Sequence, residues 1–329
     1  MSDDHEFLRN SVIIGAHPDD ELLWFTSILK KVDEVIILYR DIWSEPQMGD
    51  ARVAAIKAYP RGNVRFLEME ETGSFDCADW TSPKPGPYGM EFGTEGTRRE
   101  AKRVVKKSLS QLMPGSFRHS TRPIAQAYRE NYETLYRTLQ PRLKPDMNVF
   151  THNPWGEYGH EDHVQVFRVL DRLRDEIGFK LWMSNYCTER SMPLAMQYFS
   201  RKPVNYIRLP ADKAFAEEVA AVYRDKGCWT WRNDWIWFDD ECPTQQTRGR
   251  RLSPVADEPV QFRHRRAPTG QRAAAFGRRP FKRHGRRHHR RCAGMKIGRV
   301  FRRGHFLNLT IGTAPHPPAS TFSPPAGRR

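Results

Sequence analysis

The first forty residues alternate between strand and helix patterns, and this order permits few folds. Residues 11–16 form a short apolar run rich in β-branched side chains, which is typical of a strand buried on both faces. After a break at residues 17–20, apolar side chains recur at helical spacing to about residue 31, and residues 34–39 form a second apolar run. A strand–helix–strand unit predicts a parallel sheet.

The same alternation continues along the chain. Helices are predicted over residues 47–58, 123–140, 160–177 and 211–226, and strands over 63–69, 145–151, 180–184 and 204–209. Residues 72–97 are rich in Gly, Pro and aromatic residues without a sustained period, which predicts a long loop. We therefore expect one Rossmann-like α/β domain over residues 1–247, with a mostly parallel sheet flanked by helices.

The net charge of +15 belongs to the C-terminal tail. Residues 248–329 hold 21 of the 54 Lys and Arg residues but only Asp257 and Glu258 of the 39 acidic residues, so residues 1–247 are mildly acidic. The tail is Arg/Pro/Gly-rich, and its apolar content is too low to offset the entropy of ordering. We expect a disordered basic extension. It could bind nucleic acid or an anionic surface by counterion release, but we favour a passive solvated tail or a sequence artefact.

Cysteine usage and hydropathy predict a cytoplasmic protein. The five cysteines are odd in number, scattered, and form no Cys-x-x-Cys pair, which fits reduced thiols better than a disulfide scaffold. The N-terminal residues are acidic and lack the basic-then-apolar pattern of a signal peptide. No apolar run approaches the roughly 18 residues that a membrane-spanning helix requires.

Two clusters of His and acidic residues follow two of the predicted strands. Residues 16–21 read Ala-His-Pro-Asp-Asp-Glu and end the first strand, whereas residues 158–163 read Tyr-Gly-His-Glu-Asp-His and come shortly after the strand that ends at residue 151. Open α/β folds place their sites at the carboxyl edge of the parallel strands. If the two strands lie close together in the sheet, the two clusters face each other.

The spacing within each cluster suits a metal. His17 and Asp20 are three residues apart at a predicted helix start, as are His160 and His163, so the side chains of each pair point the same way. Three nitrogen and oxygen ligands, with water in the fourth position, are the ordinary catalytic zinc arrangement. Zinc lowers the pKa of water and polarises a carbonyl group. Amide hydrolysis also needs a base and a donor to the oxyanion, and Asp19 and His160 are available when the other residues hold the metal.

Each cluster also has an ordinary structural explanation. Asp19 and Asp20 could cap a helix by accepting hydrogen bonds from free backbone N–H groups. The pair His160 and His163 could lie on a helix surface. Their joint occurrence at the ends of two predicted buried strands favours the metal site.

Together the two motifs resemble those of the PIG-L/LmbE-like zinc N-deacetylases, which act on N-acetylglucosaminyl lipids, mycothiol precursors, glycopeptide-antibiotic sugars and similar substrates. The likeness covers roughly residues 10–240. It implies that His17, Asp20 and His163 bind one Zn²⁺ per chain, with Fe²⁺ as the other metal to consider. It also implies that Asp19 is the general base.

The resemblance assigns further roles in the second motif. It implies that His160 stabilises the oxyanion or protonates the amine, that Asp162 orients His160, and that Tyr158 contacts the tetrahedral intermediate. Glu161 stands where many members have Pro, and this position only has to fit a first helical turn. The expected function is metal-dependent hydrolysis of an N-acetyl group on an amino sugar or glycoconjugate. One alternative is an amidase for a thiol-conjugated or lipid-linked amino sugar; another is a nucleic-acid-binding protein that acts through its tail with a vestigial metal site.

Aromatic residues and one arginine are candidate contacts for the sugar. Trp80, Tyr88 and Trp155 lie on predicted loops. Arg52 could bind substrate hydroxyl groups, but we favour a position at a solvated helix start. Residues 229–237 contain four closely spaced tryptophans, which suit either a sugar-binding surface or a strand packed on the core.

Overall fold

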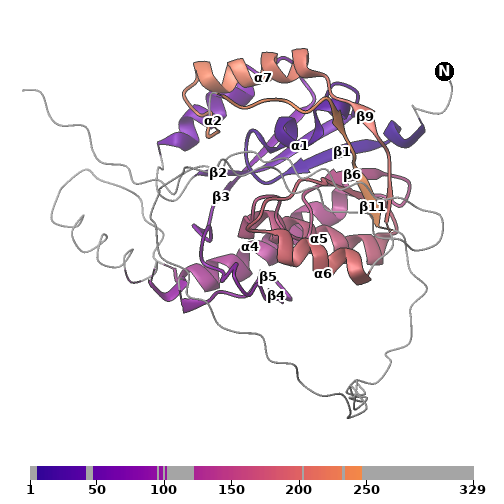
Figure 1. The fold of residues 1–329 in the computed structure, drawn as a ribbon. Helices are drawn as coiled ribbons and strands as arrows, with labels where there is room; N and C mark the ends of the chain where they lie inside the picture. Colours follow the sequence, from indigo (N-terminus) through magenta and orange to yellow (C-terminus); the bar gives the residue numbers. More distant parts are fainter. Residues whose placement is uncertain are drawn as a thin grey trace, which may run out of the picture. The chain divides into compact units, whose positions relative to one another are not determined.

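A mostly parallel sheet of seven strands forms the centre of the described part of the chain (Figure 1). This computed structural model describes residues 6–41, 47–94, 96–98, 101, 122–201, 204–231 and 234–246. The sheet strands are β1 (Ser11–Gly15), β2 (Glu34–Asp41), β3 (Val64–Glu70), β6 (Asn148–Thr151), β7 (Lys180–Met183), β8 (Val204–Tyr206) and β11 (Thr244–Gln246). Their order across the sheet is β3-β2-β1-β6-β7-β11-β8.

Strand β1 pairs in parallel with β2 on one side and with β6 on the other, so that Ile13 lies between Val35 and Phe150. The parallel arrangement continues to β3 and β7, whereas β11 runs antiparallel to both β7 and β8. Every residue of β1 is buried. The prediction of a parallel sheet from the first forty residues is thus confirmed, and the apolar run corresponds to a strand covered on both faces.

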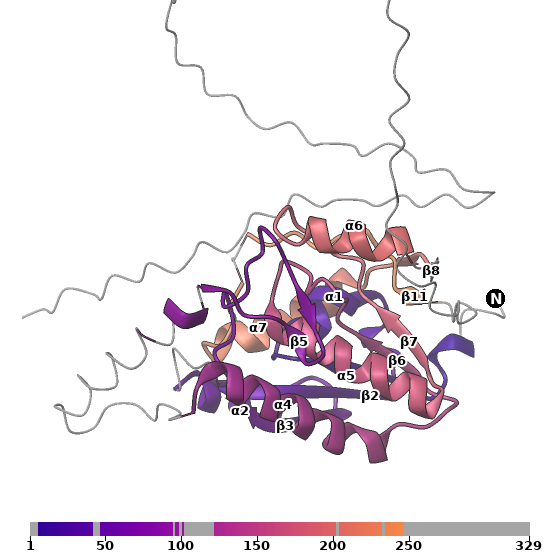
Figure 2. The same cartoon turned by 90° about the horizontal axis from the view of Figure 1, so that it is seen from below.

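Helices cover both faces of the sheet (Figures 1 and 2). They are α1 (Asp20–Leu29), α2 (Met48–Lys57), α4 (Ile124–Leu139), α5 (Glu161–Ile177), α6 (Met192–Arg201) and α7 (Lys213–Asp225). Helices α1, α2 and α7 pack on one face, and α4, α5 and α6 lie on the other. The remaining short elements are η1 (Glu6–Leu8), β4 (Pro85–Gly86), β5 (Gly89–Met90), η2 (Gln140–Arg142), β9 (Leu209–Pro210) and β10 (Asp240–Glu241).

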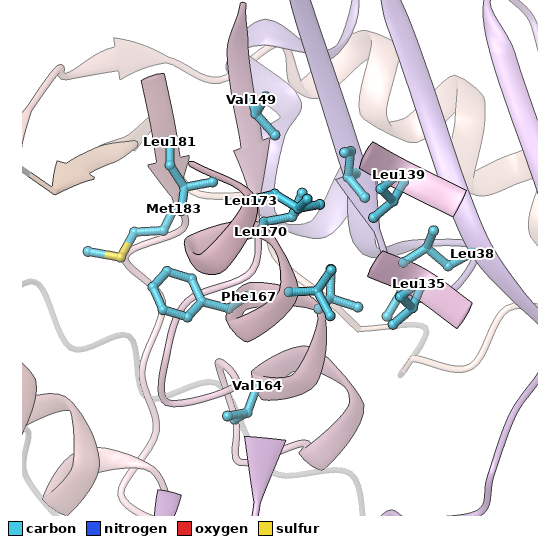
Figure 3. Close-up of a cluster of buried hydrophobic side chains, with 14 of the residues drawn as sticks. Leu38, Leu135, Leu139, Val149, Val164, Phe167, Leu170, Leu173, Leu181 and Met183 are labelled. Carbon is cyan, nitrogen blue, oxygen red and sulfur yellow. The ribbon is translucent and has the colours of Figure 1, made fainter. Parts of the chain in front are cut away.

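Helix α5 is held against the sheet by an apolar stripe. Figure 3 shows this stripe beside side chains of β6, β7 and α4: Val164, Phe167, Leu170 and Leu173 from α5, with Val149, Leu181, Met183, Leu135 and Leu139 around them. Burying one such side chain contributes about 1.5–3 kcal/mol. The helix ends at Gly178, whose φ of 102° suits the left-handed cap. This packing fixes the first turn of α5 at the carboxyl end of β6.

The predicted helices are confirmed, with boundaries that differ by a few residues. The predicted loop at residues 72–97 contains the small β4–β5 hairpin, and the strand predicted at 204–209 is divided between β8 and β9. Helix α6 and strand β11 were not predicted. Strand β11 is only three residues long and enters the sheet between β7 and β8, so its pairing depends on tertiary contacts rather than on a sequence pattern.

The basic extension at residues 248–329 lies outside the described residues. The domain boundary at residue 247 and the disorder of this tail therefore stay predictions. Within the described ranges, no helix combines the length and apolar character needed to cross a bilayer.

Candidate metal centre

The two motifs meet where the strand order changes direction. Strands β2 and β3 lie on one side of β1, and β6 and β7 lie on the other. Helix α1 begins at Asp20, five residues after β1 ends, and α5 begins at Glu161, ten residues after β6 ends. Because β1 and β6 are parallel neighbours, their carboxyl ends lie together, which is where open α/β sheets bind ligands.

Three side chains bring ligand atoms to one point. His17 Nδ1 lies 3.3 Å from His163 Nε2 and 3.4 Å from a carboxylate oxygen of Asp20, and His163 Nε2 lies 3.4 Å from the other oxygen of Asp20. Ligands at about 2.0–2.1 Å from a tetrahedral Zn²⁺ are separated by about 3.3–3.4 Å from one another. His160 also offers a nitrogen within 4.8 Å of those of His17 and His163. The buried cluster can therefore hold a metal ion, and the structure brings together the three ligands that the resemblance implied.

Asp20 is held in its ionised form. Burial alone would raise the pKa of its carboxyl, but His163 and His152 hold that pKa well below the usual value. Its oxygens also accept hydrogen bonds from the backbone N–H of His17 at 2.6 Å and from the Trp24 indole at 3.1 Å. These contacts fix the direction of both carboxylate oxygens before any ligand arrives.

Glu157 supports the cluster from behind. Its Oε2 atom lies 2.8 Å from His163 Nδ1 and 3.1 Å from His152 Nδ1. Burial would raise the pKa of Glu157, but the two histidines lower it to about 2. A tight turn directs Glu157 inward, and this turn requires glycine at position 156. Gly156 has φ 64°, and a Cβ there would lie 2.5 Å from the His160 carbonyl oxygen. Since the Nδ1 atom of His163 is engaged by a carboxylate, its Nε2 atom is left to bind a metal.

His152 lies beside the proposed ligands, and together with Asp20 and His163 it forms another group whose ligand atoms lie within 4.8 Å of one another. Its Nε2 atom accepts a hydrogen bond from the Ala16 backbone N–H at 2.9 Å, although it also lies 3.3 Å from Asp20. Its ring stacks on that of His163, with 3.9 Å between the ring centroids. Through these contacts, His152 links the end of β1 to the His163 ring.

The far nitrogen of His17 faces two carboxylates. His17 Nε2 lies 3.7 Å from Asp162 and 3.9 Å from Glu71. Burial would lower the pKa of His17, but Asp162, Asp20 and Glu71 raise it to about 10. Asp162 and Glu71 favour a proton on Nε2, so Nδ1 is the nitrogen that would lose its proton to a metal. Protons therefore compete with a metal for this cluster.

Asp19 has a backbone conformation that few side chains adopt. Its φ is 107°, and within the described residues its carboxylate makes no capping hydrogen bond to α1. Instead Oδ2 accepts a hydrogen bond from the Thr230 hydroxyl at 2.6 Å. Burial and the neighbouring Asp20 raise the pKa of Asp19 well above its usual value. The helix-cap explanation of Asp19 therefore does not describe its contacts, and the strain is of the kind found at functional sites.

His160 is the N-cap of α5. Its Nδ1 atom accepts a hydrogen bond from the Asp162 backbone N–H at 3.2 Å. Burial, together with His163 and His17, lowers the pKa of His160 well below its usual value. A neutral imidazole that accepts at Nδ1 carries its proton on Nε2, so His160 can donate a hydrogen bond.

Asp162 is linked to His160 differently from what the resemblance implied. The link runs through the Asp162 backbone, whereas its carboxylate accepts a hydrogen bond from the Ser74 hydroxyl at 2.6 Å and faces His17. The ring of Tyr158 lies beside the cluster, with its centroid 5.8 Å from that of His160 and 5.5 Å from that of His163.

The three aromatic residues that we expected to contact the sugar pack in the core or at its edge. Trp155 is fully buried and donates its indole hydrogen to the Tyr186 carbonyl at 2.7 Å. Trp80 donates to Glu161 at 3.0 Å, and Tyr88 packs edge-on against a tyrosine of α4. These three rings belong to the core or to its edge, because residues on irregular loops can still be buried.

Arg52 is also buried, so its expected position at a solvated helix start is wrong. Its guanidinium donates to the Arg40 carbonyl at 3.1 Å and lies 3.9 Å from Glu71. Arg52 thus reaches the metal cluster through Glu71. Among the described residues its Nε atom has no hydrogen-bond partner.

Several residues of the site were not predicted from the sequence. Glu71, His152 and Glu157 carry no motif of their own, although His152 and Glu157 lie in the turn-rich segment between the strand and the second motif. A buried carboxylate behind a metal-binding histidine is a common arrangement. An acidic residue shortly before the His-x-x-His pair was the only available signal.

No protein-family model matches this chain, and neither does any curated protein. The resemblance to the deacetylases therefore depends on the two motifs alone.

Proposed function

We propose that this protein is a zinc-dependent hydrolase of the PIG-L/LmbE-like type that removes an N-acetyl or short N-acyl group from an amino sugar. The strand order agrees with a Rossmann-like, doubly wound sheet. The observation that carries the proposal is the convergence of His17 Nδ1, His163 Nε2 and the Asp20 carboxylate at 3.3–3.4 Å. A cation between them would be held by two imidazole nitrogens and a carboxylate oxygen once His17 Nδ1 has lost its proton.

The surrounding residues supply the parts that amide hydrolysis needs. When bound, Zn²⁺ polarises the acyl carbonyl and makes water more acidic. Asp19 accepts a proton from the attacking water, and its oxygen other than Oδ2 is the one not held by Thr230. The Nε2–H group of His160 donates to the developing oxyanion. The water oxygen forms a bond to the acyl carbon, the C–N bond breaks, and the amine leaves with the proton that Asp19 accepted.

The experiment that tests the proposal combines metal analysis with acetate release. The purified full chain is analysed for bound metal and incubated with N-acetylated sugars, nucleotide sugars and glycolipids. We expect one Zn²⁺ per chain and acetate from at least one substrate. His163→Ala should lose both, whereas Glu176→Gln, on the exposed side of α5, should keep both. Full metal occupancy in His163→Ala, or no acetate from the metal-loaded protein, would contradict the proposal.

A thiol-conjugated or lipid-linked amino sugar remains the main alternative substrate for the same reaction. It differs only in the group attached to the sugar, and the substrate screen separates these cases. The ligands and the base would keep the same roles.

A further inference from the structure

Residues 228–241, which we call the tryptophan segment, are anchored at one end to the first motif and at the other to helix α1. Near its start the Thr230 hydroxyl donates to Asp19 at 2.6 Å. At its end Glu241 accepts hydrogen bonds from the backbone N–H and hydroxyl groups of Thr26 and Ser27, at 2.6–2.9 Å. These N–H groups are available because α1 is interrupted at Phe25, where φ is −141°. The segment is thus tied to the helix that carries Asp19 and Asp20.

The anchors place two tryptophans beside the metal centre. The ring centroid of Trp231 lies 5.3 Å from that of Tyr158 and 5.0 Å from that of Trp235. Tyr158 in turn contacts the rings of His160 and His163. Trp231 and Trp235 remain partly exposed. A continuous aromatic surface therefore leads outward from the ligands.

The indole N–H groups distinguish the tryptophans from one another. Trp24, beneath the surface, donates to Asp20, and Trp237 donates to Glu217 of α7 at 3.1 Å. Among the described residues, the buried Nε1 atoms of Trp229 and Trp235 have no acceptor, and Trp235 is the one whose ring contacts that of Trp231. A buried donor without a partner is costly, so a ligand oxygen at this point would be favourable.

A pyranose ring satisfies both features of this surface. Its C–H groups form an apolar face that can pack on an aromatic ring, and its hydroxyl oxygens accept hydrogen bonds. An alkyl chain would cover the rings but would leave the Trp235 donor unpaired. The sequence also allowed a strand packed on the core; no described residue between 228 and 239 is in a strand, although Trp231 and Trp235 do pack against the core with one part of their rings.

From these contacts we infer that Trp231 and Trp235 bind the pyranose ring of the substrate and so select cyclic amino sugars. This inference depends on the proposed function, since the ring must lie beside the ligands for its acyl group to reach them. The Trp231 face packs against the ring, and the Trp235 indole donates to a hydroxyl group. Neither residue takes part in the proton transfers.

The test measures binding to the zinc-loaded full chain carrying Asp19→Asn, which holds substrate without turnover. Calorimetry is performed with methyl N-acetyl-β-glucosaminide and with acetohydroxamate, which binds zinc but has no ring. Trp231→Ala and Trp235→Ala should each weaken glucosaminide binding about tenfold and leave acetohydroxamate binding unchanged. Trp235→Phe, which keeps a ring but lacks the donor, should also weaken glucosaminide binding. Trp237→Ala is the matched control and should change neither affinity.

The outcomes separate the two proposals. Unchanged glucosaminide affinity in both Trp231→Ala and Trp235→Ala, in protein that still binds acetohydroxamate, would overturn the role of the tryptophans and leave the metal chemistry intact. Equal losses for both ligands would also overturn it, because the effect would not depend on the ring. Absence of both zinc and acetohydroxamate binding in the parent would mark failure of the proposed function itself.

Discussion

The Nδ1 atom of His163 lies 2.8 Å from Oε2 of Glu157, and both side chains are fully buried. This contact decides which nitrogen of His163 is protonated. A carboxylate behind a metal-binding imidazole fixes the ring orientation and makes the ligand nitrogen more basic. The neighbouring His152 shares the same carboxylate, so Glu157 orders two of the rings at the site.

Glu157→Gln should weaken zinc binding about 10- to 100-fold, because an amide of the same size cannot supply the charge that His163 and His152 need. Competition with a chromogenic chelator measures the zinc affinity. Glu176→Gln, on the exposed side of α5, is the control. Zinc affinity equal to that of wild type in a folded Glu157→Gln protein would show that Glu157 does not tune the ligand.

Asp19→Asn should lower kcat about 10²- to 10⁴-fold and change KM less, because a general base acts chiefly in the transition state. Asn tolerates positive φ well and can still accept the Thr230 hydrogen bond, so the fold and the metal content should be retained. Metal stoichiometry, melting temperature and rate are measured on one preparation. Near-normal turnover with metal bound would rule out the base; loss of metal would make Asp19 a ligand.

Thr230→Val should lower kcat about tenfold with KM almost unchanged, because Asp19 loses the donor that orients it. Thr230→Ser restores a hydroxyl group at the same position and should recover most of the rate. Steady-state kinetics of the two variants provide the comparison. If Ser is as slow as Val, a hydroxyl group at this position does not restore the rate, and Thr230 does not position Asp19 through this bond alone.

Glu241→Ala should lower the free energy of unfolding by about 2–4 kcal/mol, because the buried N–H groups of Thr26 and Ser27 lose their acceptor. Urea unfolding followed by fluorescence measures the change. Glu218→Ala, at an exposed position on α7, should have little effect. A Glu241→Ala protein as stable as wild type would mean that water replaces the carboxylate at the break in α1.

The parallel sheet and the two motif positions could be predicted from sequence because they depend on local patterns. The runs at residues 11–16 and 34–39 are short and rich in β-branched side chains, which is typical of strands covered on both faces. Helix periodicity and the spacing of His17 and Asp20 are likewise local. A parallel pair of strands has both carboxyl ends at the same edge of the sheet. The two motifs face each other because β1 and β6 are such a pair.

The supporting residues were decided only by tertiary structure. Glu71, Glu157 and Glu241 reach the site or α1 through turns and pairings that no spacing in the sequence specifies, and Glu241 lies 215 residues from Thr26. Trp155 shows the opposite case, because a loop position suggested exposure whereas the structure buries it in the core. Local periodicity determines which elements form. The partner of each buried polar group is set by the folded chain, since the cost of leaving such a group unpaired appears only when water is excluded.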